Sequence, residues 1–177
     1  LIYQKVHNFC AVDLGAFYLD VIKDRQYTTQ TDSLPRRSCQ TAMYHLIEAM
    51  VRWLAPILSF TADEVWGYLP GERAPSVFTA TWYDGLTPLD PDTALDRAFW
   101  DQVLATRVAV GPALEAARKA ALIGSALDAE LDLYCDEGLY GALGRLEAEL
   151  RFALITSEVR LHPLAERPEA AVTTDLP

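Results

Sequence analysis

The chain has 177 residues, of which 51% are apolar and 10% aromatic, and its net charge is −10. This composition excludes a disordered chain, because burying so much apolar surface can offset the entropy lost on folding, and no apolar run approaches the ~20 residues that cross a bilayer. The charge is uneven, at −2 for residues 1–89 and −8 for residues 90–177. Because nucleic-acid-binding proteins are usually basic, an RNA site would have to be a local patch in the first half.

The first part of the chain predicts two helices joined by a turn. Apolar residues recur at helical spacing over residues 1–23, and residues 27–32 are polar and turn-like. Ser33 can cap the second helix, Pro35 fits its first turn, and Pro56 ends or kinks it. The apolar stripe of this second helix is wide, which predicts burial on more than one side.

Shorter elements follow the second helix. Thr61 and Glu64 fit a capping box that opens a short helix, which the Pro-Gly pair at residues 70–71 closes. The next stretch, residues 71–92, is rich in proline and glycine, and its residues 77–83 predict a short strand. We place a domain boundary in this stretch.

The second half predicts a long helix and a small α/β unit. The helix covers residues 93–120, and the Gly-Pro pair at residues 111–112 predicts a kink in it. Apolar residues then alternate with polar ones over residues 131–135, as in a half-buried strand. A helix over residues 139–152 and a second strand over residues 154–161 complete a strand–helix–strand unit.

The sequence therefore predicts a mainly α fold, an antiparallel helical bundle followed by a small α/β unit. The bundle covers residues 1–89, and the long helix and strand–helix–strand domain cover residues 90–177. Leu1 already lies in a helical pattern with no capping residue before it, and residues 171–177 are loop-like. We expect a segment of a longer protein, truncated at the N-terminus of the bundle.

Motifs of catalysis and metal binding are missing from the sequence. It contains no glycine-rich phosphate loop, no nucleophile elbow and no zinc-protease helix motif. His7 with Cys10, and His45 with Glu48, could each supply two metal ligands, but a site needs three or four. Three widely spaced cysteines form neither a disulfide framework nor a zinc pair, which favours a reducing, cytoplasmic setting.

Four basic residues are candidates for RNA binding. Lys23 and Arg25 close the first helix, whereas Arg36 and Arg37 open the second helix against its dipole. If the two helices are antiparallel neighbours, all four cations lie at one end of the bundle, where they could contact an RNA backbone. The alternative is that they pair with nearby carboxylates, namely Asp20, Asp24 and Asp32.

Arg52 and Trp53 are a second candidate, because together they could stack on an unpaired base. The alternative is that Trp53 belongs to the core beside the apolar stripe of its helix.

Seven motifs together resemble the anticodon-binding domain of bacterial isoleucyl-tRNA synthetases, which are class I aminoacyl-tRNA synthetases. They are HNFC (7–10), DLGAFYLD (13–20), KDRQYT (23–28), RRSCQT (36–41), LAPIL (54–58), FTADEVW (60–66) and VFTATW (77–82). The combination of residues 23–27 with Arg36 and Arg37 points to the isoleucine enzyme over its valyl and leucyl relatives, whose equivalent region is the alternative. The likeness continues through residues 117–129, where Ala121 stands at a position that usually carries lysine.

The resemblance implies an enzyme that joins isoleucine to its tRNA with ATP and magnesium and, in many members, carries a zinc module. The catalytic and editing domains and the zinc module lie outside this sequence, so we expect no active site, cofactor or metal within it. The expected partners are tRNA(Ile) and those missing domains, with no membrane. The predicted RNA-binding residues are Lys23, Arg25, Arg36, Arg37, Gln40, Arg52 and Trp53. The alternative is a helical spacer or interaction module that binds no RNA.

Overall fold

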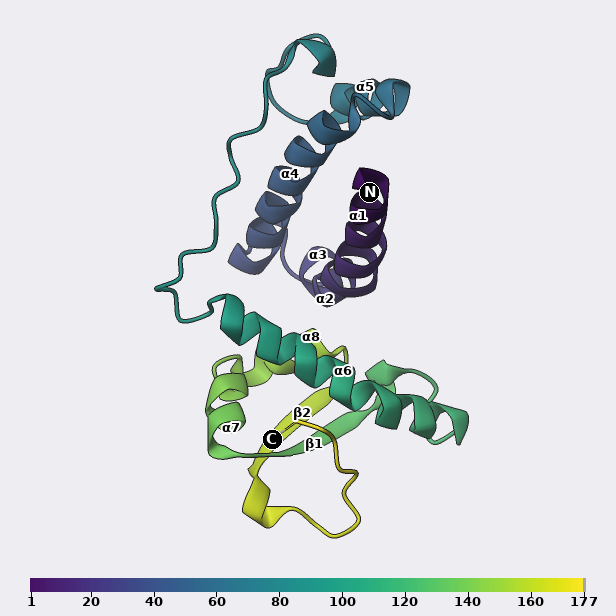
Figure 1. Cartoon of the computed structure of the whole chain (residues 1–177), viewed down its shortest axis with the longest axis vertical. Helices are drawn as coiled ribbons and strands as arrows, with labels where there is room; N and C mark the ends of the chain where they lie inside the picture. The colour runs from purple at the N-terminus through teal and green to yellow at the C-terminus, as the bar shows by residue number, and fades with distance from the viewer. Residues whose placement is uncertain (177) are drawn as a thin grey trace. The chain divides into compact units, whose positions relative to one another are not determined.

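The structure, a computed structural model, describes residues 1–176 (Figure 1). It divides into two compact units. The first, here the α4 unit, is Lys23–Pro88, and the second, here the sheet unit, combines Leu1–Ile22 with the residues from Leu89 onward. The predicted mainly α fold with a small α/β unit is confirmed. The predicted domain bounds of 1–89 and 90–177 stay a prediction. No helix within residues 1–176 is long and apolar enough to span a membrane.

The α4 unit contains three α-helices and a 3₁₀ turn. They are α3 (Lys23–Tyr27), α4 (Leu34–Leu54), α5 (Ser59–Tyr68) and η2 (Val77–Thr79). Ser33 is the N-cap residue of α4 and Pro35 lies in its first turn, as predicted, although the Ser33 side chain makes no capping hydrogen bond. Val51 and Ala55, at the end of α4, pack with Ala62, Trp66 and Val77 to form the core of this unit.

Two predictions for the α4 unit are wrong. α5 begins at Ser59 with Leu58 as its N-cap, so Thr61 lies inside the helix and opens no capping box. The predicted strand at residues 77–83 is absent, because Asp63 Oδ1 accepts hydrogen bonds from Ser76 Oγ at 2.6 Å and from the Val77 amide at 3.1 Å. These bonds hold the chain in a 3₁₀ turn, and no neighbouring strand within the described residues offers a ladder of hydrogen bonds.

The N-terminal helical segment belongs to the sheet unit. It consists of α1 (Ile2–Asn8), the π-helix η1 (Phe9–Tyr18) and α2 (Leu19–Val21), where the sequence predicted one regular α-helix. A Cβ atom on Gly15 would lie 3.1 Å from the Cys10 carbonyl oxygen. Glycine therefore permits the close approach of residues five apart that the wider π-helical turn requires.

The rest of the sheet unit is a long helix packed on a two-stranded parallel sheet (Figure 1). Helix α6 (Arg97–Lys119) begins four residues later than predicted, because Asp96 caps it through a 2.8 Å hydrogen bond from the Phe99 amide. Its helical hydrogen bonding continues past Pro112. The strands are β1 (Glu130–Cys135) and β2 (Glu158–Pro163), paired in register from Glu130↔Glu158 to Cys135↔Pro163.

The connection between the strands differs from the single helix predicted. It contains α7 (Glu137–Gly144), the 3₁₀ turn η4 (Glu147–Glu149) and α8 (Leu150–Leu154), whereas η3 (Ala126–Asp128) precedes β1 and η5 (Leu164–Glu166) follows β2. The predicted second strand began too early. Leu154 is buried in α8, and Ile155 takes a left-handed backbone conformation that ends the helix, so β2 starts only at Glu158.

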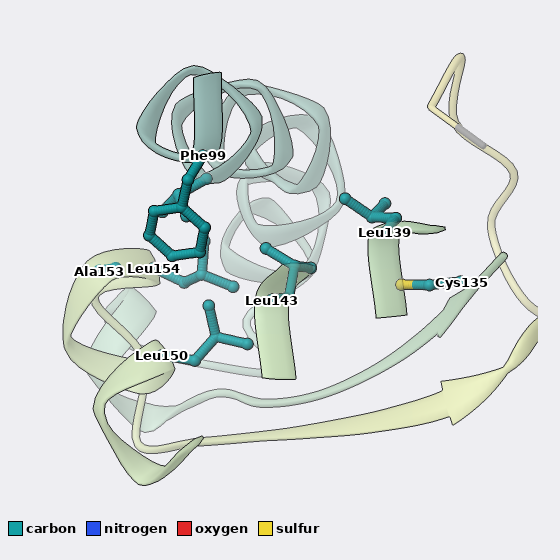
Figure 2. Packing of buried hydrophobic residues seen from close by; sticks show 8 residues of the cluster. Phe99, Cys135, Leu139, Leu143, Leu150, Ala153 and Leu154 are labelled. Atoms are coloured by element: carbon teal, nitrogen blue, oxygen red, sulfur yellow. The ribbon is translucent and has the colours of Figure 1, made fainter. Parts of the chain in front are cut away.

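A single apolar core joins α6, α7, α8 and the sheet (Figure 2). Val103, Leu143 and Leu150 are the largest side chains that are almost completely buried. The other members of this core, seen as sticks in Figure 2, are Phe99, Cys135, Leu139, Ala153 and Leu154. Both strands turn one apolar face toward these helices, and this one-sided burial is why the alternation of apolar residues in the sequence predicted the strand–helix–strand unit.

Candidate nucleic-acid interface

The start of α4 is a local basic patch in an acidic chain. Residues 23–41 carry four cations and two carboxylates, a net charge of +2 within a chain of −10. α3 packs against α4, and Arg36 Nη1 donates a 3.4 Å hydrogen bond to the Thr29 carbonyl, which ties the turn to the helix. The α4 unit therefore holds the α3 cations and the α4 cations at one end of a helix pair.

Arg36 and Arg37 differ in what surrounds them. Arg36 is half-buried and its Nε has no hydrogen-bond partner among residues 1–176, whereas Arg37 is exposed. Neither arginine forms an ion pair with any carboxylate of the described residues. The alternative in which these two arginines are held by nearby aspartates therefore finds no contact in the structure. Their charge at the start of α4 is left for solvent or a ligand.

Gln40 extends this patch along α4. It is exposed and lies three residues after Arg37, so the two side chains share one face of the helix. Thr41 is also exposed, and its hydroxyl donates to the Arg37 carbonyl at 2.8 Å. This face of α4 could therefore contact an RNA phosphate and, beside it, other hydrogen-bonding groups of the RNA.

Arg52 and Trp53 lie at the other end of α4. Sixteen residues separate Arg37 from Trp53, which corresponds to about 24 Å along a helix. The structure therefore brings together Lys23, Arg25, Arg36, Arg37 and Gln40 and keeps Arg52 and Trp53 apart from them. A ligand that used both groups would have to extend along the helix.

Arg52 belongs to a cluster of charged and aromatic side chains, here the Glu48 cluster, made of Glu48, Arg52, Trp66, Arg73 and Tyr83. Arg52 Nη1 lies 2.6 Å from Glu48 Oε2, and Arg73 Nη2 lies 3.0 Å from Glu48 Oε1. Both guanidinium groups lie over the Trp66 ring, at 4.7 and 4.6 Å from its centroid. Arg52 also lies 5.2 Å from the Tyr83 ring centroid.

The environment of Glu48 keeps it ionised. Its side chain is 4% exposed, and this burial acts to raise the pKa. The hydrogen bond from Arg52 and the ion pair with Arg73 outweigh it and hold the pKa of Glu48 below its ordinary value of 4.5. The guanidinium of Arg52 is thus engaged by a carboxylate and two rings. Arg52 keeps its place among the predicted RNA-binding residues only as a prediction.

Trp53 is partly exposed and has an aromatic neighbour. Its ring centroid lies 6.0 Å from that of Trp82, with the planes tilted by 37°. Trp53 is 37% exposed and Trp82 73% exposed. The alternative that places Trp53 in the core is wrong, since the core of this unit is formed around Trp66.

Sequence reasoning missed Arg73, Trp82 and Tyr83. The Glu48–Arg52 spacing of four residues could have indicated the first ion pair. Arg73, Trp82 and Tyr83 contact residues of α4 from the irregular segments after α5. No periodicity in the sequence predicts such contacts. His45, considered above as a metal ligand, lies 2.5 Å from the Tyr83 hydroxyl through its Nδ1. No group of three or more potential metal ligands exists among residues 1–176.

Comparison with known proteins identifies the class. Residues 1–133 match the family model described as the anticodon-binding domain of tRNA ligase. The chain therefore belongs to this family, and the predicted anticodon-binding class is confirmed.

Three relatives of the chain carry the same name. The chain is 62% identical over all of its 177 residues to an isoleucine–tRNA ligase of Nitrosococcus oceani. Over 99% of the chain it is 59% identical to isoleucine–tRNA ligases of Methylococcus capsulatus and of Stutzerimonas stutzeri. The predicted resemblance to isoleucyl-tRNA synthetases is thus confirmed. The chain spans 19% of the length of each of these relatives.

Proposed function

We propose that this chain binds the anticodon stem and loop of tRNA(Ile) and positions that tRNA for ATP-dependent attachment of isoleucine by a catalytic domain elsewhere in the enzyme. The membership in the anticodon-binding family carries the proposal. The names of the relatives support isoleucine as the amino acid. In this proposal the chain binds and orients the tRNA, and its residues take part in no bond-making step.

The basic patch supplies the proposed backbone contacts. Lys23, Arg25, Arg36 and Arg37 would contact phosphates, and Gln40 would add hydrogen bonds on the same helix face. Trp53, with Arg52 beside it, would belong to the surface that unpaired bases approach, about 24 Å away along α4. Phosphate contacts fix the register of the RNA, whereas contacts to bases carry sequence information. The patch is small, so we expect weak binding with a clear dependence on salt.

ATP and magnesium would act in the catalytic domain, and zinc in the module that many members carry. The described residues provide no set of three His, Cys, Asp or Glu that fits a metal ion, so no step is assigned to a metal within this chain. A reducing, cytoplasmic setting also remains part of the proposal, and it rests on the three free cysteines.

The experiment is a titration of the 177-residue chain with a fluorescently labelled tRNA(Ile) transcript and an anticodon-swapped transcript, each at several salt concentrations. We expect tighter binding to the cognate transcript and weaker binding as salt rises. In the Arg36→Ala/Arg37→Ala variant, affinity for both transcripts should fall, and the slope of log K against log salt should become shallower by about 1.4–1.8.

A matched control removes two cations from the sheet unit. Arg97→Ala/Arg118→Ala changes the net charge by the same amount, and both side chains are exposed on α6, where they pair with neighbouring carboxylates. Its binding should equal that of the parent. If the two double variants behaved alike, the basic patch would have no special role in RNA binding.

A second candidate function is a helical spacer that binds no RNA. The charge of −8 on residues 90–177 favours it for that part of the chain. Absence of binding to either transcript at low salt would support the spacer over the anticodon-binding proposal.

A further inference from the structure

Two successive residues of α4 pair with two successive residues of the segment that follows η2. Arg52 lies over the Tyr83 ring at 5.2 Å, and Trp53 lies against Trp82 at 6.0 Å. Tyr83 makes a second contact with α4, because its hydroxyl lies 2.5 Å from His45 Nδ1. Burial raises the pKa of Tyr83, so the phenol stays protonated at neutral pH and can donate that hydrogen bond.

Trp82 is not needed to hold this segment on the helix. Val77 in η2, 3% exposed, anchors the chain in the core just before this segment, and Tyr83 anchors the segment itself through Arg52 and His45. If Trp82 served mainly as a packing residue, most of the residue would be buried, yet Trp82 is 73% exposed. A large aromatic surface left in water beside a second, 37% exposed indole indicates a binding surface.

We infer that Trp82 and Trp53 form a stacking surface for one unpaired RNA base, with the base lying on the exposed face of Trp82. This inference rests on the proposed function and adds to it a base-binding residue, Trp82. Aromatic rings are common platforms for unpaired bases, because every base offers a flat π-face.

The ring geometry selects one mode of stacking. A base inserted between two rings needs two stacking intervals of about 3.4 Å each, a total of about 6.8 Å. The two indoles are 6.0 Å apart and tilted by 37°, so they are too close to enclose a base. Trp53 therefore supports Trp82 from behind, and the base contacts Trp82 from the solvent side.

The distance along α4 suits one RNA hairpin. The roughly 24 Å between Arg37 and Trp53 equals about seven stacked nucleotide steps. An RNA whose backbone contacts the basic patch could therefore present an unpaired base to Trp82. The surroundings of Trp82 carry little net charge, because the Glu48 cluster is +1 and the exposed Asp84 is −1. Stacking there should add affinity that does not depend on salt.

The test compares Trp82→Ala and Trp82→Phe in the 177-residue chain, with an anticodon stem-loop of tRNA(Ile) as the probe. Trp82→Ala should weaken binding by about 5- to 140-fold, from ~1–3 kcal/mol per stacked base at 1.4 kcal/mol per tenfold. The loss should be equal at every salt concentration, with the slope of log K against log salt unchanged. Trp82→Phe should keep most of the affinity, because a smaller aromatic ring still stacks.

Phe60→Ala is the matched control, since it removes another aromatic ring of the α4 unit, 93% exposed and outside the Trp pair. It should bind like the parent. A second arm uses stem-loops with one loop base removed at a time. For one of these abasic probes the parent should lose the affinity that Trp82→Ala loses, and the variant should lose nothing more.

The outcomes separate the two proposals. If the parent binds the stem-loop with the expected salt dependence but Trp82→Ala binds equally well, the stacking surface is refuted and the proposed function stands. If Phe60→Ala weakens binding as much as Trp82→Ala, the effect is a general one of exposed aromatics and the inference is also refuted. If the parent binds no stem-loop at low salt, the proposed function fails and this inference fails with it. Circular dichroism of each variant checks that it remains folded.

Discussion

Replacing Glu48 by glutamine is expected to destabilise the α4 unit, because the carboxylate lies between two arginines. Its oxygens are 2.6 Å from Arg52 Nη1 and 3.0 Å from Arg73 Nη2, and both guanidinium groups lie over the buried Trp66 ring. Glutamine has nearly the same shape and keeps one acceptor oxygen. The substitution therefore removes the negative charge while changing the packing little.

The size of the effect follows from the burial of the three charges. Removing one partner of a fully buried ion pair costs about 3–5 kcal/mol. Here the carboxylate is 4% exposed but the arginine side chains are 17% and 14% exposed, so they retain some contact with water. We expect a loss of about 2–3 kcal/mol in the free energy of unfolding of this unit. For a unit of this length that loss lowers the Tm by roughly 8–24 °C.

Urea denaturation followed by tryptophan fluorescence measures this loss. Three of the four tryptophans, Trp53, Trp66 and Trp82, lie in the α4 unit, and a Trp100→Phe background removes the one in the sheet unit. Glu64→Gln is the matched control, because Glu64 is exposed on α5 in the same unit. Its free energy of unfolding should stay within about 0.5 kcal/mol of the parent.

The pH dependence gives a second check on the same residue. Because the folded state holds the pKa of Glu48 below 4.5, the carboxylate stabilises the unit fully above about pH 4.5, and this contribution is lost as the pH falls through the folded-state pKa. The difference between the parent and Glu48→Gln should be constant from pH 5 to 7 and shrink below 4.5. Equal stability of parent and Glu48→Gln at pH 7 would refute a stabilising role for the carboxylate.

Three further predictions concern the sheet unit. Leu143→Ala should cost about 2–5 kcal/mol in the free energy of unfolding, because Leu143 is completely buried in the core of α6, α7, α8 and the sheet; a cost under 1 kcal/mol by urea denaturation would contradict that packing. Asp96→Ala should lower the free energy of unfolding by about 1 kcal/mol, because it removes the side chain that accepts a hydrogen bond from the Phe99 amide at the start of α6. Thermal melts followed by circular dichroism test this, with Asp96→Asn, which keeps an acceptor oxygen, expected to lose less. Arg160 holds the pKa of Asp132 at about 2, below 3.8, with a smaller contribution from a neighbouring histidine. The stabilisation from Asp132 is therefore present above pH 3.8 and lost as the pH falls toward 2, so melts of Asp132→Asn and the parent should converge near pH 2 and differ at pH 6.

Local patterns in the sequence were sufficient for several elements. The Ser33 and Pro35 signals located the start of α4, and the period-two alternation located β1. The errors have two other causes, a contact between residues far apart in the sequence and an unusual backbone conformation. The 3₁₀ turn at residues 77–79 depends on Asp63, fourteen residues away from Val77, and the late start of β2 depends on the left-handed Ile155. Neither the Asp63 hydrogen bond nor the Ile155 conformation can be predicted from the spacing of apolar residues.

The sequence by itself determined the class of this protein, because family motifs and cation positions are properties of residues in order along the chain. The basic residues at the start of α4 could be singled out in this way, since neighbours along a helix are neighbours in space. Only the tertiary structure decided what Arg52 and Trp53 contact. Tyr83, which contacts Arg52, lies 31 residues away along the chain, and Trp82, which contacts Trp53, lies 29 residues away, both in the irregular segment after η2. Contacts from such segments depend on where the folded chain passes, and that is set by the packing of the whole unit rather than by any local period.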